Sequence, residues 1–362
     1  MASSEVEVKP SEVKPFQVER QMGQEANKQK TVKRSWKESK KMWAIAGPAI
    51  LVSVSQFSIG FVTVAFAGHL GELQLAAVTV TTNVIEGFVF GIMVIAMLIY
   101  VVSGYFPDSW TGLSLLAFKS LWGFVKLSLA SAVMLCLELW YFTAIILMVG
   151  YLKNPTLAVD AISICMNLQL WTSMVTLGFN AAVSLRVSNE LGAGRPKAAR
   201  FSIVVAVLTS LAVGIIFMAI ILATKHDFPK LFTDKPKVIK EASKLGYFLA
   251  ATIFLNSILP VLHGVAVGAG WQFYVGLINI VCYYLFGIPA GALLGFKFKL
   301  RVEGIWSGML VGTVLQTTIL LFVMLRASWR KEAVQAEERL RTWGGPTPNQ
   351  TPENSLESSA GS

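Results

Sequence analysis

The sequence predicts an all-α membrane protein, a polytopic helix bundle of about eight spans. Hydrophobic residues make up 54% of the 362-residue chain and charged residues 14%, and the mean hydropathy is +0.60. These values lie outside ordinary soluble usage. In addition, charge-free runs of spanning length recur along the chain. The longest run, residues 245–296, must hold two helices at roughly 20 residues per span.

Charged or turn-forming residues divide the apolar runs into spans. The first run follows a polar, basic segment, and Gly268 and Gly270 form the predicted turn inside the longest run. The predicted spans cover residues 44–66, 77–104, 121–149, 160–188, 200–223, 245–267, 271–295 and 304–326.

A basic, glycine-containing loop joins the fourth and fifth spans. Its motif consists of Arg186, Glu190, Gly192, Gly194 and Arg195. The two glycines allow the positive φ angles that end a helix, and the arginines are typical of a cytoplasmic loop. The loops at 225–244 and 297–301 are also basic, yet an alternating path places them outside the cell. The N-terminus is therefore expected in the cytoplasm, with these two loops as the conflicting evidence.

The regions outside the spans exclude several classes of function. Residues 1–41 form a predicted basic cytoplasmic tail without a secretory signal, and residues 327–362 form a second one, a short amphipathic helix followed by disorder. The net charge of +10 is spread over tails and loops, so no nucleic-acid partner is expected. The three cysteines lie within spans, and we expect no disulfide framework, no metal site and no cofactor.

Acidic side chains inside the spans are the strongest functional candidates, because a charge in hydrocarbon costs roughly 2.5–3.5 kcal/mol on insertion scales. Glu138 lies in mid-span, Glu86 lies in another apolar segment, and Asp160 lies at the mouth of a span. Such a group can take up and release a proton during transport. The alternative is an acid that only holds helices together or, for Asp160, one that caps a helix.

Other polar residues within the spans have plainer interpretations. His263 lies on an apolar face and is expected to be a satisfied core histidine. Each embedded asparagine either lines a polar cavity or joins helices, and packing is the favoured role for any single one. The sequence contains no Gly-x-Ser-x-Gly, no P-loop, no His-Glu-x-x-His and no Cys-x-x-Cys. The chain is therefore not expected to be an enzyme.

Five segments together carry a family resemblance. They are residues 46–50 (AGPAI), 67–73 (AGHLGEL), 132–141 (AVMLCLELWY), 186–195 (RVSNELGAGR) and 265–272 (VAVGAGWQ). In these segments the chain resembles the plant DETOXIFICATION type of the multidrug and toxic compound extrusion (MATE) family. The resemblance implies a cation- or proton-coupled antiporter for organic solutes. It places the proton-linked glutamate at Glu138, a second carboxylate at Asp160 and a polar position of the later lobe at Asn256.

The chain departs from this family in its first half. The family has twelve spans in two six-helix lobes, whereas this sequence offers about eight. Residues 83–93 resemble the front of the second family helix, and residues 94–103 resemble the back of the sixth. We infer an internal deletion that leaves a truncated first lobe at 42–117 and a complete second lobe at 118–326. The resemblance also leads us to expect Gln and Ser where this chain has Leu259 and His263.

The resulting hypothesis is a secondary active antiporter that exports or sequesters organic solutes, including xenobiotics, in exchange for protons. Candidate residues of its substrate cavity are Tyr141, Asn167, Trp171 and Asn256. Expected partners are the lipid bilayer, a small organic solute, protons, and a homo-oligomer or a full-length homologue. The alternative is a non-transporting form that binds or inhibits that homologue. The plasma membrane and the vacuolar membrane are both open as locations.

Overall fold

The computed structural model describes residues 15–70, 89, 91–103, 121–152 and 155–342. This part of the chain is helical and contains no strand. The elements are α1 (Pro15–Leu70), α3 (Leu121–Gly150), α4 (Pro155–Gly192), α5 (Pro196–Thr224), η2 (Phe228–Leu231), α6 (Pro236–Ala269), α7 (Gln272–Asn279), η3 (Ile280–Gly287), α8 (Ile288–Ala292), η4 (Leu293–Lys297), α9 (Arg301–Arg326) and α10 (Trp329–Thr342). The all-α prediction is confirmed.

Seven helices in the described residues are long and apolar enough to cross a membrane. They correspond to seven of the eight predicted spans. The remaining predicted span, 77–104, falls largely outside the described residues, but its later part forms the apolar helix Gly91–Val102. The predicted turn in the longest run is also present, because α6 ends at Ala269 and Gly270 takes a left-handed φ of 82°.

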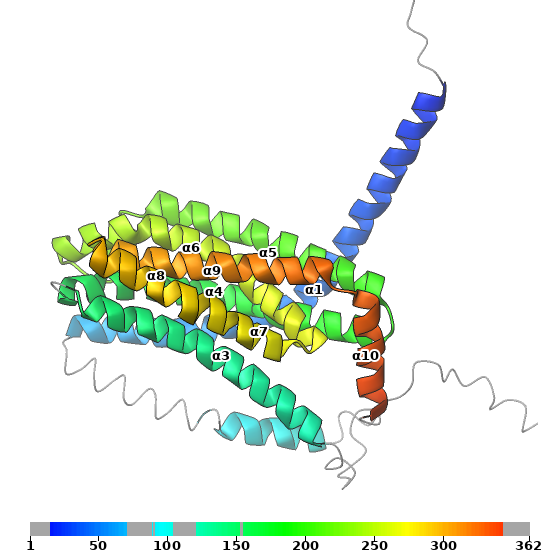
Figure 1. Ribbon diagram of the computed structural model, residues 1–362, viewed down its shortest axis with the longest axis horizontal. Helices are drawn as coiled ribbons and strands as arrows, with labels where there is room; N and C mark the ends of the chain where they lie inside the picture. The colour runs from blue at the N-terminus through cyan, green and yellow to red at the C-terminus, as the bar shows by residue number, and fades with distance from the viewer. Residues whose placement is uncertain (1–14, 71–88, 90, 104–120, 153–154, 343–362) are drawn as a thin grey trace, which may run out of the picture.

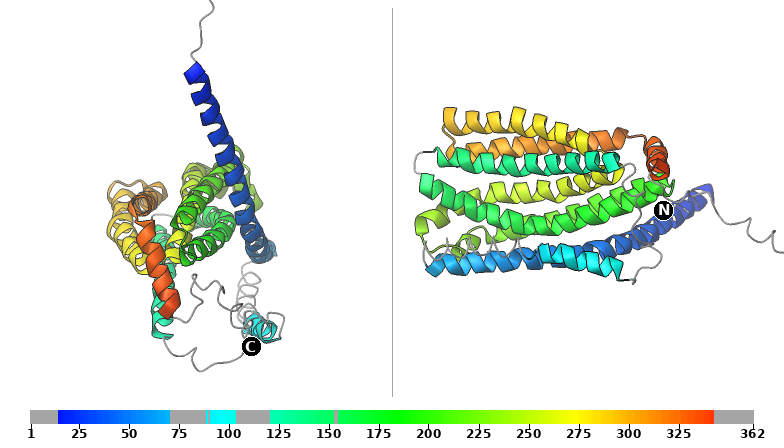
Figure 2. Two further views of the ribbon diagram at one scale, coloured as in Figure 1. Left: turned by 90° about the vertical axis from the view of Figure 1, so that its right-hand side faces the viewer. Right: turned by 90° about the horizontal axis from the view of Figure 1, so that it is seen from below.

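The spanning helices run side by side, with α10 across one end of the bundle and the N-terminal part of α1 projecting away from it (Figures 1 and 2). Helix α6 occupies the centre of this packing and contacts α4, α5 and α9. Its approach to α4 depends on Gly264, where an added Cβ would lie 2.5 Å from the carbonyl oxygen of Asn180. Small residues permit such close helix contacts in membranes, where dispersion contacts replace the hydrophobic effect.

Two apolar clusters fill the bundle, one toward each end. The cluster next to the loop 193–195, here called the loop-side cluster, includes Met42, Met134, Val187, Leu191, Val275, Leu320 and Trp329. The opposite cluster, here called the far-side cluster, includes Tyr141, Leu152, Phe228, Val238, Cys282, Ile305 and Met309. The division matters for function because a band of polar side chains lies where the clusters meet.

The seventh span is irregular, since α-helical turns alternate with the π-helices η3 and η4 between Gln272 and Lys297. Widened π turns are rare and occur frequently at functional sites. This span packs against α9 through glycines on both sides. The closest approach is at Gly308, where an added Cβ would lie 2.1 Å from the backbone nitrogen of Gly291.

Gly308→Ala is expected to destabilise the protein by about 1–3 kcal/mol, because the new methyl group meets backbone that cannot move aside cheaply. Thermal unfolding of the detergent-solubilised protein measures the effect. Gly276→Ala on α7 is the matched control, since no heavy atom lies within 4 Å of its added Cβ. Equal melting temperatures for the two variants would contradict the close packing of α9 on the π-helical span.

Candidate functional site

Glu138 lies in the middle of α3, and its side chain is 23% exposed. Its Oε2 atom is 3.7 Å from Nδ1 of His263 on α6, whose side chain is 4% exposed. This separation is short enough for an ion pair but longer than a direct hydrogen bond. His263 was expected to be an ordinary core histidine. The structure instead places it beside the principal candidate acid.

A chain of amide side chains continues from His263 to two further helices. Gln316 of α9 has its Nε2 atom 3.0 Å from Nε2 of His263. The same amide nitrogen donates to Oδ1 of Asn279 at the end of α7. Asn279 in turn donates through Nδ2 to the carbonyl oxygen of Met134 at 3.4 Å. Because Met134 precedes Glu138 by one turn of α3, the polar chain returns to the helix on which it begins.

This polar chain lies at the boundary between the two apolar clusters. On α3, Glu138 separates Met134 of the loop-side cluster from Tyr141 of the far-side cluster. The other two helices repeat the pattern. Asn279 lies between Val275 and Cys282, and Gln316 lies between Leu320 and Met309. Buried polar groups in such surroundings depend on one another, because the low local dielectric strengthens each bond and penalises each unpaired atom.

Sequence reasoning missed Gln316, and for Asn279 it favoured a packing role over a place in a polar cavity. Both are fully buried within charge-free segments. The available signal was the presence of an amide near the centre of each of two neighbouring apolar runs. Polar residues at that depth join helices or form part of a transport pathway. Their pairing with His263 required the structure, since helix rotation decides which side chains meet.

The candidate cavity residues do not share one cavity. Tyr141 is buried, stacks on Tyr283 with ring centroids 4.2 Å apart, and donates from its hydroxyl to the Met309 carbonyl at 3.3 Å. It therefore packs α3 against its neighbours. Asn167 is exposed on α4 and donates to the Ser163 carbonyl at 2.9 Å.

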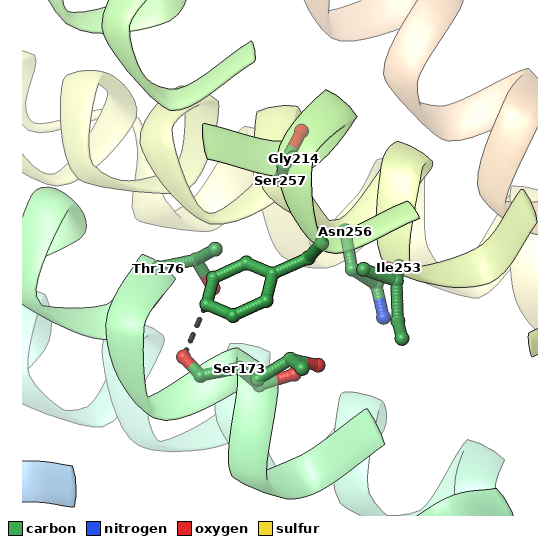
Figure 3. A pocket seen from close by; sticks show the side chains of 8 residues that line it. Ser173, Thr176, Gly214, Ile253, Asn256 and Ser257 are labelled. Carbon is green, nitrogen blue, oxygen red and sulfur yellow. Dashed lines mark hydrogen bonds between the residues drawn. The ribbon is translucent and has the colours of Figure 1, made fainter. Parts of the chain in front are cut away.

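Trp171 does not line the pocket that contains Asn256. The Trp171 indole donates to the Ser58 hydroxyl of α1 at 3.0 Å, joining the fourth helix to the first. Asn256 of α6 lines a small pocket with Ser173 and Thr176 of α4 and with Phe217 of α5 (Figure 3). The pocket has room for about one water molecule and not for an organic solute.

The structure places neither of the other two candidate acids in the site around Glu138. Asp160 is exposed near the start of α4, and no contact joins it to Glu138. Glu86 lies outside the described residues. In the part of the chain that the structure describes, no group of three or more His, Cys, Asp or Glu side chains is arranged to hold a metal ion.

The loop motif forms an ion cluster at the end of the bundle near α10. Arg186 of α4 contacts the Glu38 carboxylate of α1 at 2.6 Å and Glu190 at 3.0 Å. Arg195 contacts the other oxygen of Glu190 at 2.9 Å, and the Ser202 hydroxyl of α5 donates to Glu38 at 2.6 Å. The cluster thus connects three helices across the loop.

The glycines of the motif end the helix as predicted. Gly192 is the last residue of α4, and Gly194 has a left-handed φ of 66°. The backbone N–H of Arg195 donates to the Glu190 carbonyl at 2.8 Å. This bond closes the turn and satisfies a carbonyl that the ending helix leaves free.

Comparison with known proteins shows which family has this architecture. Residues 130–293 match the MatE family. The chain is 37% identical to Protein DETOXIFICATION 33 of Arabidopsis thaliana, in an alignment covering 85% of this chain and 92% of the relative. The chain belongs to the MATE family. Its fold agrees, with a TM-score of 0.65 to the crystal structure of the eukaryotic MATE transporter AtDTX14 at 32% identity. That match covers 75% of this chain and 59% of the other.

The comparisons also bear out the internal deletion. The alignment with Protein DETOXIFICATION 33 extends over 446 positions, more than the 362 residues of this chain. The relative therefore contains a long internal segment without a counterpart here. The match to Protein DETOXIFICATION 34 of Arabidopsis thaliana is shorter but has a higher identity, 52% over 250 residues. It covers 69% of this chain and 46% of the relative. This MATE protein is an integral membrane protein that lacks an internal segment present in Protein DETOXIFICATION 33.

Proposed function

We propose that the protein is a secondary active antiporter that moves organic solutes across a membrane in exchange for protons. The observation that carries this proposal is Glu138, a carboxyl group in mid-span beside His263 and between two apolar clusters. An acid within a membrane span is a group that can take up and release a proton during transport. Similarity to a MATE transporter supports the same activity.

In this cycle, a proton taken up by Glu138 removes its negative charge and weakens its attraction to His263. The second lobe, taken as residues 118–326, then changes its packing and releases a bound solute. Asn167 and Trp171 lie one turn apart on α4, and Trp171 reaches α1 of the shortened first lobe, taken as residues 42–117. We assign solute contact to this face of α4, between the lobes. Asp160 is the proposed second carboxylate, near the mouth of the same helix.

The test is uptake of a fluorescent organic cation by sealed vesicles that contain only this chain, under an imposed pH gradient. We expect uptake that depends on the gradient and is abolished by a protonophore. Vesicles with a full-length DETOXIFICATION relative serve as the positive control, and protein-free vesicles give the background. Background uptake by the inserted chain, with the relative active alongside, would refute the proposed antiport.

A further inference from the structure

The direction of the polar chain around His263 follows from its last member, the carbonyl oxygen of Met134. A carbonyl only accepts hydrogen bonds, so the Asn279 amide must present its nitrogen to Met134. Its oxygen then faces Gln316, which must present nitrogen in return. The same Gln316 nitrogen faces Nε2 of His263. Each donor assignment thus follows from the one before it.

This order determines the tautomer of His263. An amide nitrogen only donates, so Nε2 of His263 must be an acceptor without a hydrogen. The ring hydrogen of the neutral imidazole is then on Nδ1, the atom that faces Glu138 at 3.7 Å. Turning the amides around would oppose the Asn279 oxygen to the Met134 carbonyl, two acceptors without a donor.

We propose that His263 is a positioning residue for proton exchange at Glu138, held as the Nδ1–H tautomer by the chain from Met134 through Asn279 and Gln316. This inference rests on the proposed role of Glu138 as the proton carrier. A donor that faces a carboxylate stabilises the ionised form, so loss of this donor is expected to favour the protonated form of Glu138.

The surroundings of His263 isolate this interaction. Charge-free segments of α4, α5, α9 and the seventh span pack against or around α6 and contain no other histidine, acid or base. On the remaining side, α3 contributes Glu138. Tyr283 of η3 lies close to both Glu138 and the Gln316 side chain, and Tyr141 stacks on that ring, but neither phenol is charged near neutral pH. The behaviour of His263 is therefore governed by Glu138 and by Gln316.

The polar chain leaves the side-chain oxygen of Gln316 in an unfavourable position. Oε1 is buried and meets no donor in hydrogen-bond geometry among the described residues, although the Tyr283 side chain lies beside the Gln316 amide. An unpaired buried acceptor is unfavourable. A second proton on Nε2 of His263 would need such an acceptor, but turning the Gln316 amide would break its bond to Asn279. That bond reaches the junction of α7 with the π-helix η3. The polar chain therefore disfavours the doubly protonated form of His263. Through Asn279 it also links the protonation state of His263 to the π-helical span.

The test is a pH titration of Glu138 in the full chain in lipid, followed by the infrared carbonyl band of its protonated carboxyl group. Loss of the band in Glu138→Gln assigns it. In His263→Ser, half-protonation is expected to move to higher pH by about one unit, a tenfold change in proton affinity. Serine is the residue expected here from the family pattern, so this variant should fold.

Two further variants separate the two ring nitrogens. His263→Asn places an amide donor near the position of Nδ1 and is expected to titrate close to the wild type. In His263→Gln, the longer side chain places its amide toward Gln316 instead. The pH at which Glu138 is half-protonated is then expected to shift in the same direction as in His263→Ser. Unchanged titration in both the Ser and Gln variants would overturn the proposal, as would an Asn variant that shifts as far as they do.

The tautomer is measured independently by ¹⁵N NMR of the imidazole, since the chain has only three histidines and the other two can be replaced. We expect hydrogen on Nδ1 and a bare Nε2 at neutral pH. Gln316→Glu, which offers Nε2 an acceptor, should convert the ring to the doubly protonated form. Hydrogen on Nε2 in the wild type would refute the assignment. Both readouts work without transport, so failed uptake with the expected titration would refute the antiport alone.

Discussion

Glu138→Gln is expected to reduce pH-driven solute uptake to the background of protein-free vesicles. The amide has nearly the same shape as the carboxyl group and keeps an oxygen atom in the place that faces His263, so the packing of α3 should be preserved. It cannot gain or lose a proton in this pH range, however. Solute binding and membrane insertion should therefore continue while coupling to the proton gradient is lost.

The measurement compares initial uptake rates with and without the pH gradient, at equal amounts of inserted protein. Glu303→Gln is the matched control, because this acid lies in the first turn of α9 and outside the polar chain. It should retain the gradient dependence. Uptake by Glu138→Gln that still responds to the gradient would show that another group carries the proton, and Asp160 would be the next candidate.

The positions of the spans could be predicted because the cost of burying charge leaves little choice. Runs such as 161–185 and 201–224 are too apolar and too long to be anything but membrane-spanning helices in most proteins. In the structure they lie within α4 and α5. The end of α6 could also be predicted from the sequence, because the helix ends in a left-handed residue and glycine, here Gly270, adopts that conformation most readily. Local chemistry decides these features, so a single sequence is sufficient.

The polar chain could not be predicted in the same way. Glu138 was identifiable as an acid in hydrocarbon, but its contact with His263 depends on how α3 and α6 are rotated and how far they have slid past one another. The π-helical turns of η3 alter the register after Asn279, which no periodicity in this apolar segment indicates. Composition therefore predicts which residues are costly to bury, whereas tertiary packing decides which of them meet.

Arg186→Ala is expected to destabilise the protein by about 3 kcal/mol or more. It would leave the carboxylates of Glu38 and Glu190, 12% and 7% exposed, without the guanidinium that lies between them. Removing one partner from a largely buried ion pair typically costs about 3–5 kcal/mol. The lower end of this range is expected here, because Glu190 keeps its contact with Arg195 and Glu38 keeps the hydrogen bond from Ser202. Thermal unfolding in detergent near neutral pH measures the loss.

Arg195→Ala is the matched control for this cluster. Arg195 also contacts Glu190, but its side chain is 63% exposed, and pairs of this kind contribute about 0–1 kcal/mol. The comparison tests more than one ion pair, because Glu38 belongs to α1 and Arg186 to α4. If the cluster fastens the shortened first lobe to the second, Glu38→Gln should recover part of the stability lost in Arg186→Ala by removing one unpaired charge. Equal losses for Arg186→Ala and Arg195→Ala, with no recovery in the double variant, would mean that apolar contacts alone hold α1 in place.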